Sequence, residues 1–221
     1  MKLNNRYWLL LILIIISGTV FGKKLLIKNT DRDTPVNPEV TVVKNGEAVA
    51  YFASGCFWCV EAVFESVKGV KKAYPGYSGG TKPNPTYQEV GAGLTDYAEA
   101  VEVIYDPKVV SFETLVRVFF GSQDPTTLNR QGPDIGKQYR SIAFYENPEQ
   151  KKTIENVIKE LNRTTYKGKI TTQVEPFKKF YRAEAYHIDY VEKHPDNPYV
   201  RRVSIPRLNE FKAKFPQYLK K

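Results

Sequence analysis

The sequence has 221 residues, a formal net charge of +9, two cysteines and two histidines. This length suits one domain with a sizeable core, and two cysteines exclude a fold held by several disulfides. The basic side chains occur as scattered pairs such as Lys71-Lys72 and Arg201-Arg202 rather than as one stripe, so we expect a solvated surface and no nucleic-acid partner.

Residues 1–22 have the pattern of a secretory signal. Lys2 and Arg6 form a positive start, and an unbroken apolar run follows at 8–16. This run is shorter than the roughly 20 residues that a transmembrane helix needs. We therefore expect export to a periplasm or cell envelope, with cleavage near Gly22. An uncleaved N-terminal membrane anchor is the alternative.

The charged, proline-bearing residues 23–43 are expected to form a linker or extended arm, and residues 44–221 the folded domain. Within it, alternation and helical spacing predict the elements in chain order. They are a strand at 47–53, a helix from about 56 to 67, a further strand, a strand at 99–105, a helix at 112–120 capped by Ser111, a strand at 141–145, a helix opened by Asn147-Pro148 that runs to about Leu161, and a strand at 170–174.

This order predicts an α+β single domain. Its mixed or antiparallel sheet should be covered by helices on one face, around a split βαβ, ferredoxin-like core with long loops. A Gly/Pro/Tyr loop at 75–93 would be unusually long for such a domain unless it builds a site. In the strand 99–105, Glu99 and Glu102 alternate to opposite faces, so one of them should be enclosed or functional.

Both cysteines lie in Ser54-Gly55-Cys56-Phe57-Trp58-Cys59, where the first strand meets the first helix. We expect Ser54 to cap the helix and place Cys56 in its first turn, where free amides and the helix dipole lower a cysteine pKa and make the sulfur nucleophilic. Cys59 follows one turn later and can close a disulfide with Cys56. Phe57 and Trp58 indicate a pocket for a small apolar group such as a methyl, or else anchor the helix in the core.

Four other readings of the cysteine pair stay open. A structural disulfide is disfavoured because so short a loop removes little chain entropy. A zinc site with His187 and His194 is disfavoured because their spacing is wider than usual, so we expect no metal. The strongest alternative is an exported thiol–disulfide oxidoreductase. The last is a binding module in which the cysteines only staple a pocket.

Several blocks over about residues 48 to 195 resemble, in order, the type A peptide methionine sulfoxide reductases, which reduce methionine-S-sulfoxide. These blocks are Gly55-Cys56-Phe57-Trp58, Gly76-Tyr77-Ser78-Gly79-Gly80 with Pro83-Asn84-Pro85-Thr86-Tyr87, Ala98-Glu99-Ala100-Val101, Gln131-Gly132-Pro133-Asp134-Ile135-Gly136 with Gln138-Tyr139-Arg140-Ser141, and Phe180-Tyr181 with Ala183-Glu184-Ala185-Tyr186-His187. The resemblance implies that 44–221 is the catalytic domain of such an enzyme.

By this resemblance Cys56 is the nucleophile and Glu99 the proton donor, which must be buried enough to stay protonated near neutral pH. Tyr87 and Tyr139 hydrogen-bond the sulfoxide oxygen, and Asp134 helps to order the site. Phe57 and Trp58 bind substrate. The substrates are oxidised proteins or peptides, with free methionine sulfoxide a further candidate, and the enzyme is expected to be a monomer without a bound cofactor.

Recycling is where this sequence departs from many members of the family. They have glycine at the position of Cys59 and a recycling cysteine near the C-terminus, which this sequence lacks. Attack leaves a sulfenic acid on Cys56, and Cys59 is the only intramolecular thiol able to resolve it. We expect a Cys56–Cys59 disulfide that a thioredoxin-like dithiol reopens. Direct reduction of the sulfenic acid by an external thiol is the alternative.

Overall fold

A computed structural model describes residues 43, 44 and 46–221. The predicted signal 1–22 and nearly all of the predicted arm 23–43 lie outside the described residues. Within the described part, none of the helices has the length and apolar character needed to cross a membrane.

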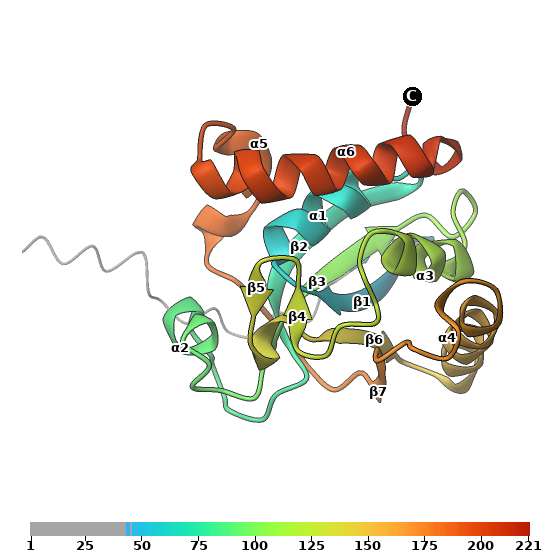
Figure 1. Cartoon of the computed structure of the whole chain (residues 1–221), viewed down its shortest axis with the longest axis horizontal. Coiled ribbons are helices and arrows are strands. Elements are labelled where there is room, and N and C mark those ends of the chain that lie inside the picture. Colours follow the sequence, from blue (N-terminus) through green and yellow to red (C-terminus); the bar gives the residue numbers. More distant parts are fainter. Residues whose placement is uncertain (1–42, 45) are drawn as a thin grey trace, which may run out of the picture. The chain divides into compact units, whose positions relative to one another are not determined.

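A six-stranded sheet with the order β7-β6-β1-β3-β2-β8 forms the centre of the fold (Figure 1). Its strands are β1 (Ala48–Ser54), β2 (Val70–Ser78), β3 (Ala98–Tyr105), β6 (Ser141–Tyr145), β7 (Gln173–Pro176) and β8 (Phe180–Arg182). All neighbours are antiparallel except β6 and β7. The central order β6-β1-β3-β2 is that of a split βαβ core, which confirms the predicted fold class.

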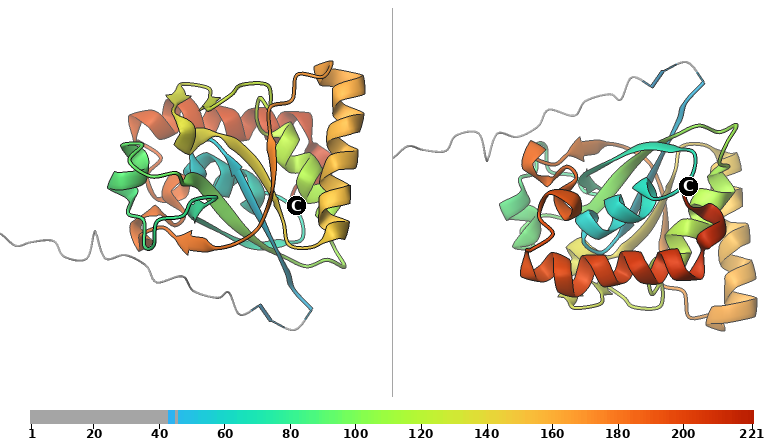
Figure 2. Two further views of the ribbon diagram at one scale, coloured as in Figure 1. Left: turned by 90° about the horizontal axis from the view of Figure 1, so that it is seen from below. Right: turned by 90° about the horizontal axis from the view of Figure 1, so that it is seen from above.

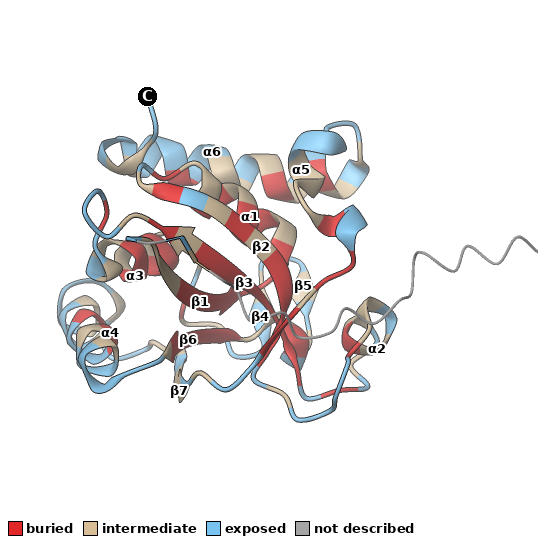
Figure 3. Cartoon of the chain, turned by 180° about the vertical axis from the view of Figure 1, so that it is seen from behind, coloured by how far each residue is buried: buried red, intermediate tan, exposed pale blue. Residues whose placement is uncertain are grey.

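The helices cover one face of this sheet and leave their outer surfaces exposed (Figures 1 and 3). They are α1 (Phe57–Glu65), α2 (Tyr87–Gly91), α3 (Phe112–Gly121), α4 (Pro148–Leu161), α5 (Tyr190–Lys193) and α6 (Ile205–Lys214). Single 3₁₀ or π turns occur at Lys137–Tyr139, Asn162–Tyr166, Ala185–His187, Val200–Ser204 and Pro216–Tyr218. A two-stranded hairpin, β4 (Arg130–Gln131) and β5 (Asp134–Ile135), stands apart from the main sheet.

The opposite face of the sheet is covered by the chain segment that joins β7 to β8. Phe177 in this segment stacks on Tyr51 of β1, with ring centroids 3.7 Å apart. Figure 2 (left) shows the segment, in orange, crossing beneath the sheet. Strand β7 pairs with β6 at one edge of the sheet, and β8 pairs with β2 at the other edge. One continuous stretch of chain therefore supplies both outermost strands.

Local signals located two of the later helices, α3 and α4, well. Ser111 Oγ accepts a hydrogen bond from the Thr114 amide, and Asn147 Oδ1 accepts one from the Gln150 amide, so α3 and α4 start where the sequence predicts. The strand 141–145 is also confirmed, whereas the strand predicted at 170–174 lies a few residues later, at Gln173–Pro176.

The predicted loop 75–93 is wrong over much of its length. Strand β2 continues through Pro75 to Ser78, and α2 occupies Tyr87–Gly91. The Pro75 carbonyl accepts a hydrogen bond from the amide of Ala183 (2.9 Å), the residue just after β8 ends. The N and the carbonyl of a strand residue point to the same side, so the N–H that proline lacks would also face this position beyond β8. Proline is therefore tolerated within β2.

Helix α6 has no counterpart in the sequence prediction. Its inner face carries Arg207, Leu208 and the fully buried Phe211, at the helical spacing that a core-facing stripe requires. This face lies along α1 (Figures 1 and 2). The helix thereby comes next to the segment that carries both cysteines.

Candidate active site

Both thiols lie at the N-terminal end of α1. Cys56 is the residue immediately before the helix, Cys59 lies in its first turn, and both are free and buried. The two thiols lie close enough for the ionisation of each to affect the other. A disulfide between them therefore requires only a small local movement.

Gly55 makes the sharp connection between β1 and this helix. Its φ is +80°, and a Cβ there would lie 2.5 Å from the Cβ of Gln131. Both the positive φ and the close approach require glycine. The glycine of the cysteine motif thus lets the β4–β5 hairpin pack directly against the turn that presents Cys56.

The prediction that Ser54 caps α1 is wrong. Ser54 is the last residue of β1, and its carbonyl and hydroxyl oxygens accept hydrogen bonds from the Arg207 guanidinium (3.0 and 3.2 Å). Cys56 occupies the capping position without making a side-chain cap hydrogen bond. The Ser54 hydroxyl, which the local sequence predicted as the cap of α1, instead accepts a hydrogen bond from Arg207 of α6.

The carboxyl of Glu99 accepts a hydrogen bond at the N-terminal end of α1 instead. The Phe57 amide donates a hydrogen bond of 3.0 Å to Glu99 Oε2. This carboxyl lies on β3 and is 2% exposed. Burial, reinforced by the negative charges of Asp134 and Cys59, raises the pKa of Glu99 to about 8, although the Phe57 hydrogen bond opposes the shift. Glu99 therefore carries a proton at neutral pH beside Cys56.

The expected low pKa of Cys56 is contradicted. Burial, the hydrogen bond and charge of Cys59, and the Glu99 carboxylate together raise the Cys56 pKa. The hydrogen bond from Cys56, the charge of Arg207 and a hydrogen bond with Ser204 lower the pKa of Cys59. The helix-terminal amide that was expected to stabilise a Cys56 thiolate is used by Glu99. Cys59 is therefore the more easily ionised of the two thiols.

Aromatic side chains gather on the same helix end. The Phe57 ring lies 6.1 Å from that of Tyr87, and the Trp58 ring stacks on Tyr190 at 3.8 Å. The Trp58 indole N–H donates to His187 Nδ1 (2.9 Å), so the His187 proton is on Nε2. Burial lowers the His187 pKa to about 3, and the ring is neutral. This network fixes the orientation of Trp58 beside Cys56.

Glu184 anchors the start of α2 against this cluster. Its Oε1 accepts the Tyr87 amide (3.0 Å), and its Oε2 accepts the Tyr77 hydroxyl (2.9 Å). The carboxyl is 5% exposed and lies 3.8 Å from His187 Nε2. Glu184 therefore sets the position of Tyr87, although the sequence assigned it no role.

Tyrosine hydroxyls and Asp134 complete the site. Burial and the charges of Glu99 and Cys56 raise the pKa values of Tyr87 and Tyr139, which stay protonated hydrogen-bond donors. Asp134 on β5 accepts the Tyr199 hydroxyl at 2.6 Å, and burial raises its pKa. Tyr199 also lies near Cys56 and lowers the pKa of that thiol. Among 15 tyrosines, no local signal marks Tyr199; only the fold brings it here.

The structure thus brings the predicted site residues to one place, while their catalytic roles remain predictions. These residues are Cys56, Cys59, Phe57, Trp58, Glu99, Tyr87, Tyr139 and Asp134. The sequence missed Tyr199, Ser204 and Arg207, which arrive from the C-terminal segment.

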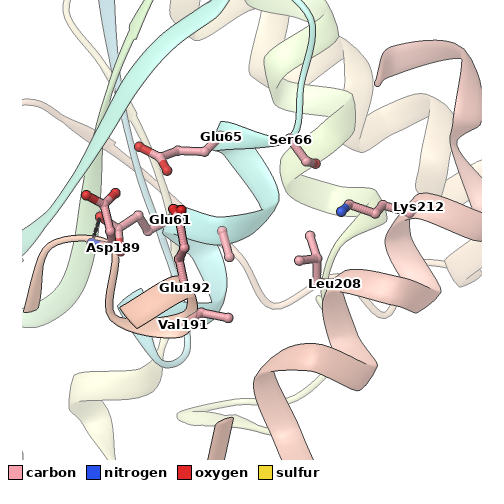
Figure 4. A pocket seen from close by; sticks show the side chains of 9 residues that line it. Glu61, Glu65, Ser66, Asp189, Val191, Glu192, Leu208 and Lys212 are labelled. Atoms are coloured by element: carbon pink, nitrogen blue, oxygen red, sulfur yellow. Dashed lines mark hydrogen bonds between the residues drawn. The ribbon is translucent and has the colours of Figure 1, made fainter. Parts of the chain in front are cut away.

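A hollow of about 320 Å³ lies between α1, α5 and α6 (Figure 4). Glu61, Glu65 and Asp189 converge there, with possible ligand atoms within 4.8 Å of one another. The Lys72 ammonium already pairs with Glu65 and Asp189, so a lysine neutralises this cluster. The predicted site residues do not line this hollow.

A helix-terminal cysteine pair beside a protonated carboxyl, on a split βαβ sheet, defines a thiol-based oxidoreductase. Residues 48–219 match the family model described as peptide methionine sulfoxide reductase. The peptide methionine sulfoxide reductase MsrA of Saccharolobus solfataricus is 48% identical over 172 residues, which are 78% of this chain and 97% of that protein. An MsrA of Thermus thermophilus is 47% identical over 174 residues, 79% of this chain and 98% of that protein.

Solved structures agree. The methionine sulfoxide reductase A of Corynebacterium diphtheriae superposes with a TM-score of 0.67 at 32% identity, covering 77% of this chain and 91% of its own. Reduced Mxr1 of Saccharomyces cerevisiae gives a TM-score of 0.66 at 32% identity, with 74% and 94% covered. The chain belongs to the peptide methionine sulfoxide reductase family.

Proposed function

We propose that this enzyme reduces methionine-S-sulfoxide in oxidised proteins and peptides to methionine, with Cys56 as the nucleophile and Glu99 as the proton donor. Family membership supports the reaction, and preference for the S epimer rests on the resemblance to type A enzymes. The observation that carries the proposed mechanism is the buried, protonated Glu99 carboxyl at the helix end that presents Cys56.

In the first step the Cys56 sulfur attacks the sulfoxide sulfur while Glu99 protonates its oxygen, because an unprotonated oxide is a poor leaving group. The proton of the Cys56 thiol passes to the Glu99 carboxylate, so Glu99 ends the step protonated. The methionine sulfur is reduced, and Cys56 is oxidised to a sulfenic acid. A neutral Glu99 serves twice: it supplies the proton, and it removes one negative charge that would raise the Cys56 pKa. Tyr87 and Tyr139 donate hydrogen bonds to the sulfoxide oxygen, and Phe57 and Trp58 hold the methyl group.

In the second step the Cys59 thiolate attacks the Cys56 sulfur. The S–S bond forms, the S–O bond breaks, and the oxygen takes a proton from Glu99 and leaves as water. A thioredoxin-like dithiol then reopens the disulfide by thiol exchange. The closeness of the two buried thiols supports this route over direct reduction by an external thiol.

The deciding experiment is turnover of separated S and R epimers of a methionine sulfoxide peptide with dithiothreitol. We expect wild type to reduce the S epimer and Cys56→Ser to be inactive. If neither epimer is reduced while the disulfides of insulin are, the chain is a general thiol–disulfide oxidoreductase.

We also propose that the enzyme is exported to the cell envelope. The positive start at Lys2 and Arg6 and the apolar run that follows support this location. Cell fractionation of the full-length chain, with N-terminal sequencing of the product, tests both export and cleavage near Gly22. An uncut protein in the cytosolic fraction would contradict the proposal.

A further inference from the structure

The second cysteine is held by groups from a part of the chain far away in sequence. The Cys59 thiol donates to Ser204 Oγ at 3.2 Å, and Ser204 is fully buried. Once Cys59 ionises, the same hydroxyl can turn and donate to the sulfur. Ser204 therefore accommodates both protonation states of Cys59.

Arg207 lies one helical turn after Ser204, on the same face. Its guanidinium donates to the Ser122 carbonyl (2.7 Å) and to both oxygens of Ser54 (3.0 and 3.2 Å). These bonds connect α6 to the ends of α3 and β1 and fix the cation beside the turn that carries Cys56. Arg207 Nη1 lies only 3.6 Å from the place where a Cβ on Gly55 would be.

The other ionisable groups around Cys59 are acids. They are Cys56 just before α1, Glu99 on β3, Asp134 on β5 and Tyr199 in the segment before α6. Each of them, when ionised, opposes a negative charge on Cys59. Arg207 is the cation that acts on Cys59 from the described residues around it.

The geometry points to Arg207 and Ser204 as positioning residues for recycling: Ser204 holds the Cys59 sulfur by a hydrogen bond, and Arg207, fixed by Ser54 and Ser122, places a positive charge near it, so that the sulfur is ready to attack an oxidised Cys56. This inference rests on the proposed function for the reaction that Cys59 completes. It goes further in explaining how a buried second thiol can act as a nucleophile among acids. It also gives the C-terminal helix α6 a part in the chemistry.

Two effects of opposite sign follow from losing the cation. If the Cys59 pKa rises by about one unit, the thiolate fraction at low pH falls about tenfold, while intrinsic nucleophilicity rises about threefold. Disulfide formation should then slow about threefold at low pH and quicken by up to about threefold at high pH. The two rate profiles should cross, which a purely structural role of Arg207 would not produce.

The first test does not depend on sulfoxide chemistry. In a Cys56→Ser background, thiolate absorbance against pH reports the ionisation of Cys59 alone. We expect the midpoint to rise on adding Arg207→Gln or Ser204→Ala, to be partly restored by Arg207→Lys, and to stay in place with Lys212→Gln, an exposed cation on the same helix. Identical midpoints in all of these variants would overturn the inference.

The second test follows recycling itself. Reduced enzyme receives one equivalent of a methionine-S-sulfoxide peptide without reductant, and free thiols are alkylated at timed intervals over a series of pH values. Methionine is measured in the same samples, so loss of the first step is separated from loss of the second. Crossing profiles for disulfide formation support the inference, and profiles parallel to wild type overturn it.

The variants also keep the two proposals apart. A wild-type enzyme that forms no methionine refutes the proposed function, while the thiolate titration still decides the role of Arg207. Thermal unfolding checks that each variant is folded. If Arg207→Gln does not fold, Ser204→Ala decides, since it removes only a hydroxyl.

Discussion

The Phe57 amide that opens α1 donates its hydrogen bond to Glu99, not to a cysteine. The helix terminus therefore stabilises a carboxyl whose pKa is nevertheless raised to about 8 by burial. A proton donor and a nucleophile are placed on the same helix end by this one contact. The predictions below follow from it and from the neighbouring contacts.

Replacing Glu99 with Gln should preserve the hydrogen bond to Phe57 and remove the proton. We expect the rate of methionine formation in a single turnover to fall by about 10²- to 10⁴-fold, the usual contribution of a positioned acid. Near-normal rates in Glu99→Gln would contradict the assignment.

The pH dependence of the first step should have an alkaline limb set by Glu99. The folded carboxyl is protonated below its pKa of about 8, so the rate should fall as the pH rises through that value. The measurement is the single-turnover rate against pH. In Glu99→Gln this limb should disappear at a lower overall rate, and its persistence would assign it to another group.

The raised Glu99 pKa also has a stability consequence. The folded state binds the Glu99 proton more tightly than the unfolded state, whose ordinary value is 4.5. The contribution of Glu99 to stability is therefore full at low pH and declines as the pH rises from about 4.5 to about 8. Denaturant unfolding at several pH values should show a shallower decline for Glu99→Gln than for wild type.

Replacing Cys59 with Ser should stop recycling through the disulfide. We expect a single turnover with one methionine per enzyme, after which a sulfenic acid on Cys56 persists and reacts with dimedone. Thioredoxin should no longer sustain turnover, while a small thiol such as dithiothreitol should. A disulfide-free wild-type enzyme after one turnover would instead indicate direct reduction by the external thiol.

Gly55→Ala should lower the free energy of unfolding by more than the strain of a positive φ at alanine accounts for. Gly168 provides the matched control, because its φ of +78° is nearly the same as the +80° of Gly55 and nothing lies within 4 Å of a Cβ there. Gly168→Ala should cost about 1–2 kcal/mol of unfolding free energy. Gly55→Ala should cost that amount and more, because the new Cβ meets Gln131. Equal losses in urea unfolding would show that the hairpin moves away freely.

Local patterns were sufficient for much of the sheet and for two helices. The alternation in β3 correctly separated Glu99 from Glu102, and both are buried, on opposite faces. Glu102 pairs with Arg182, while Glu99 meets α1. Side-chain caps on α3 and α4 were legible because each lies within a few residues of the helix it starts.

Interactions between distant segments explain the failures. The hydroxyl of Ser54 accepts a hydrogen bond from Arg207, 153 positions away, and the Cys56 pKa is raised mainly by burial beneath segments distant in sequence. Strand β2 passes through Pro75 because β8 ends beside it. None of these three effects leaves a trace in the neighbouring sequence, so helix-start and turn rules gave the wrong result at these positions.

The segment that crosses the sheet from β7 to β8 also affects how the enzyme meets other chains. The two outermost strands of the sheet that it joins are short: β7 has four residues and ends in Pro176, and β8 has three. Such short borders expose few free backbone amides and carbonyls, which are the groups that recruit an extended foreign chain. The sheet is thus a poor template for aggregation with another polypeptide.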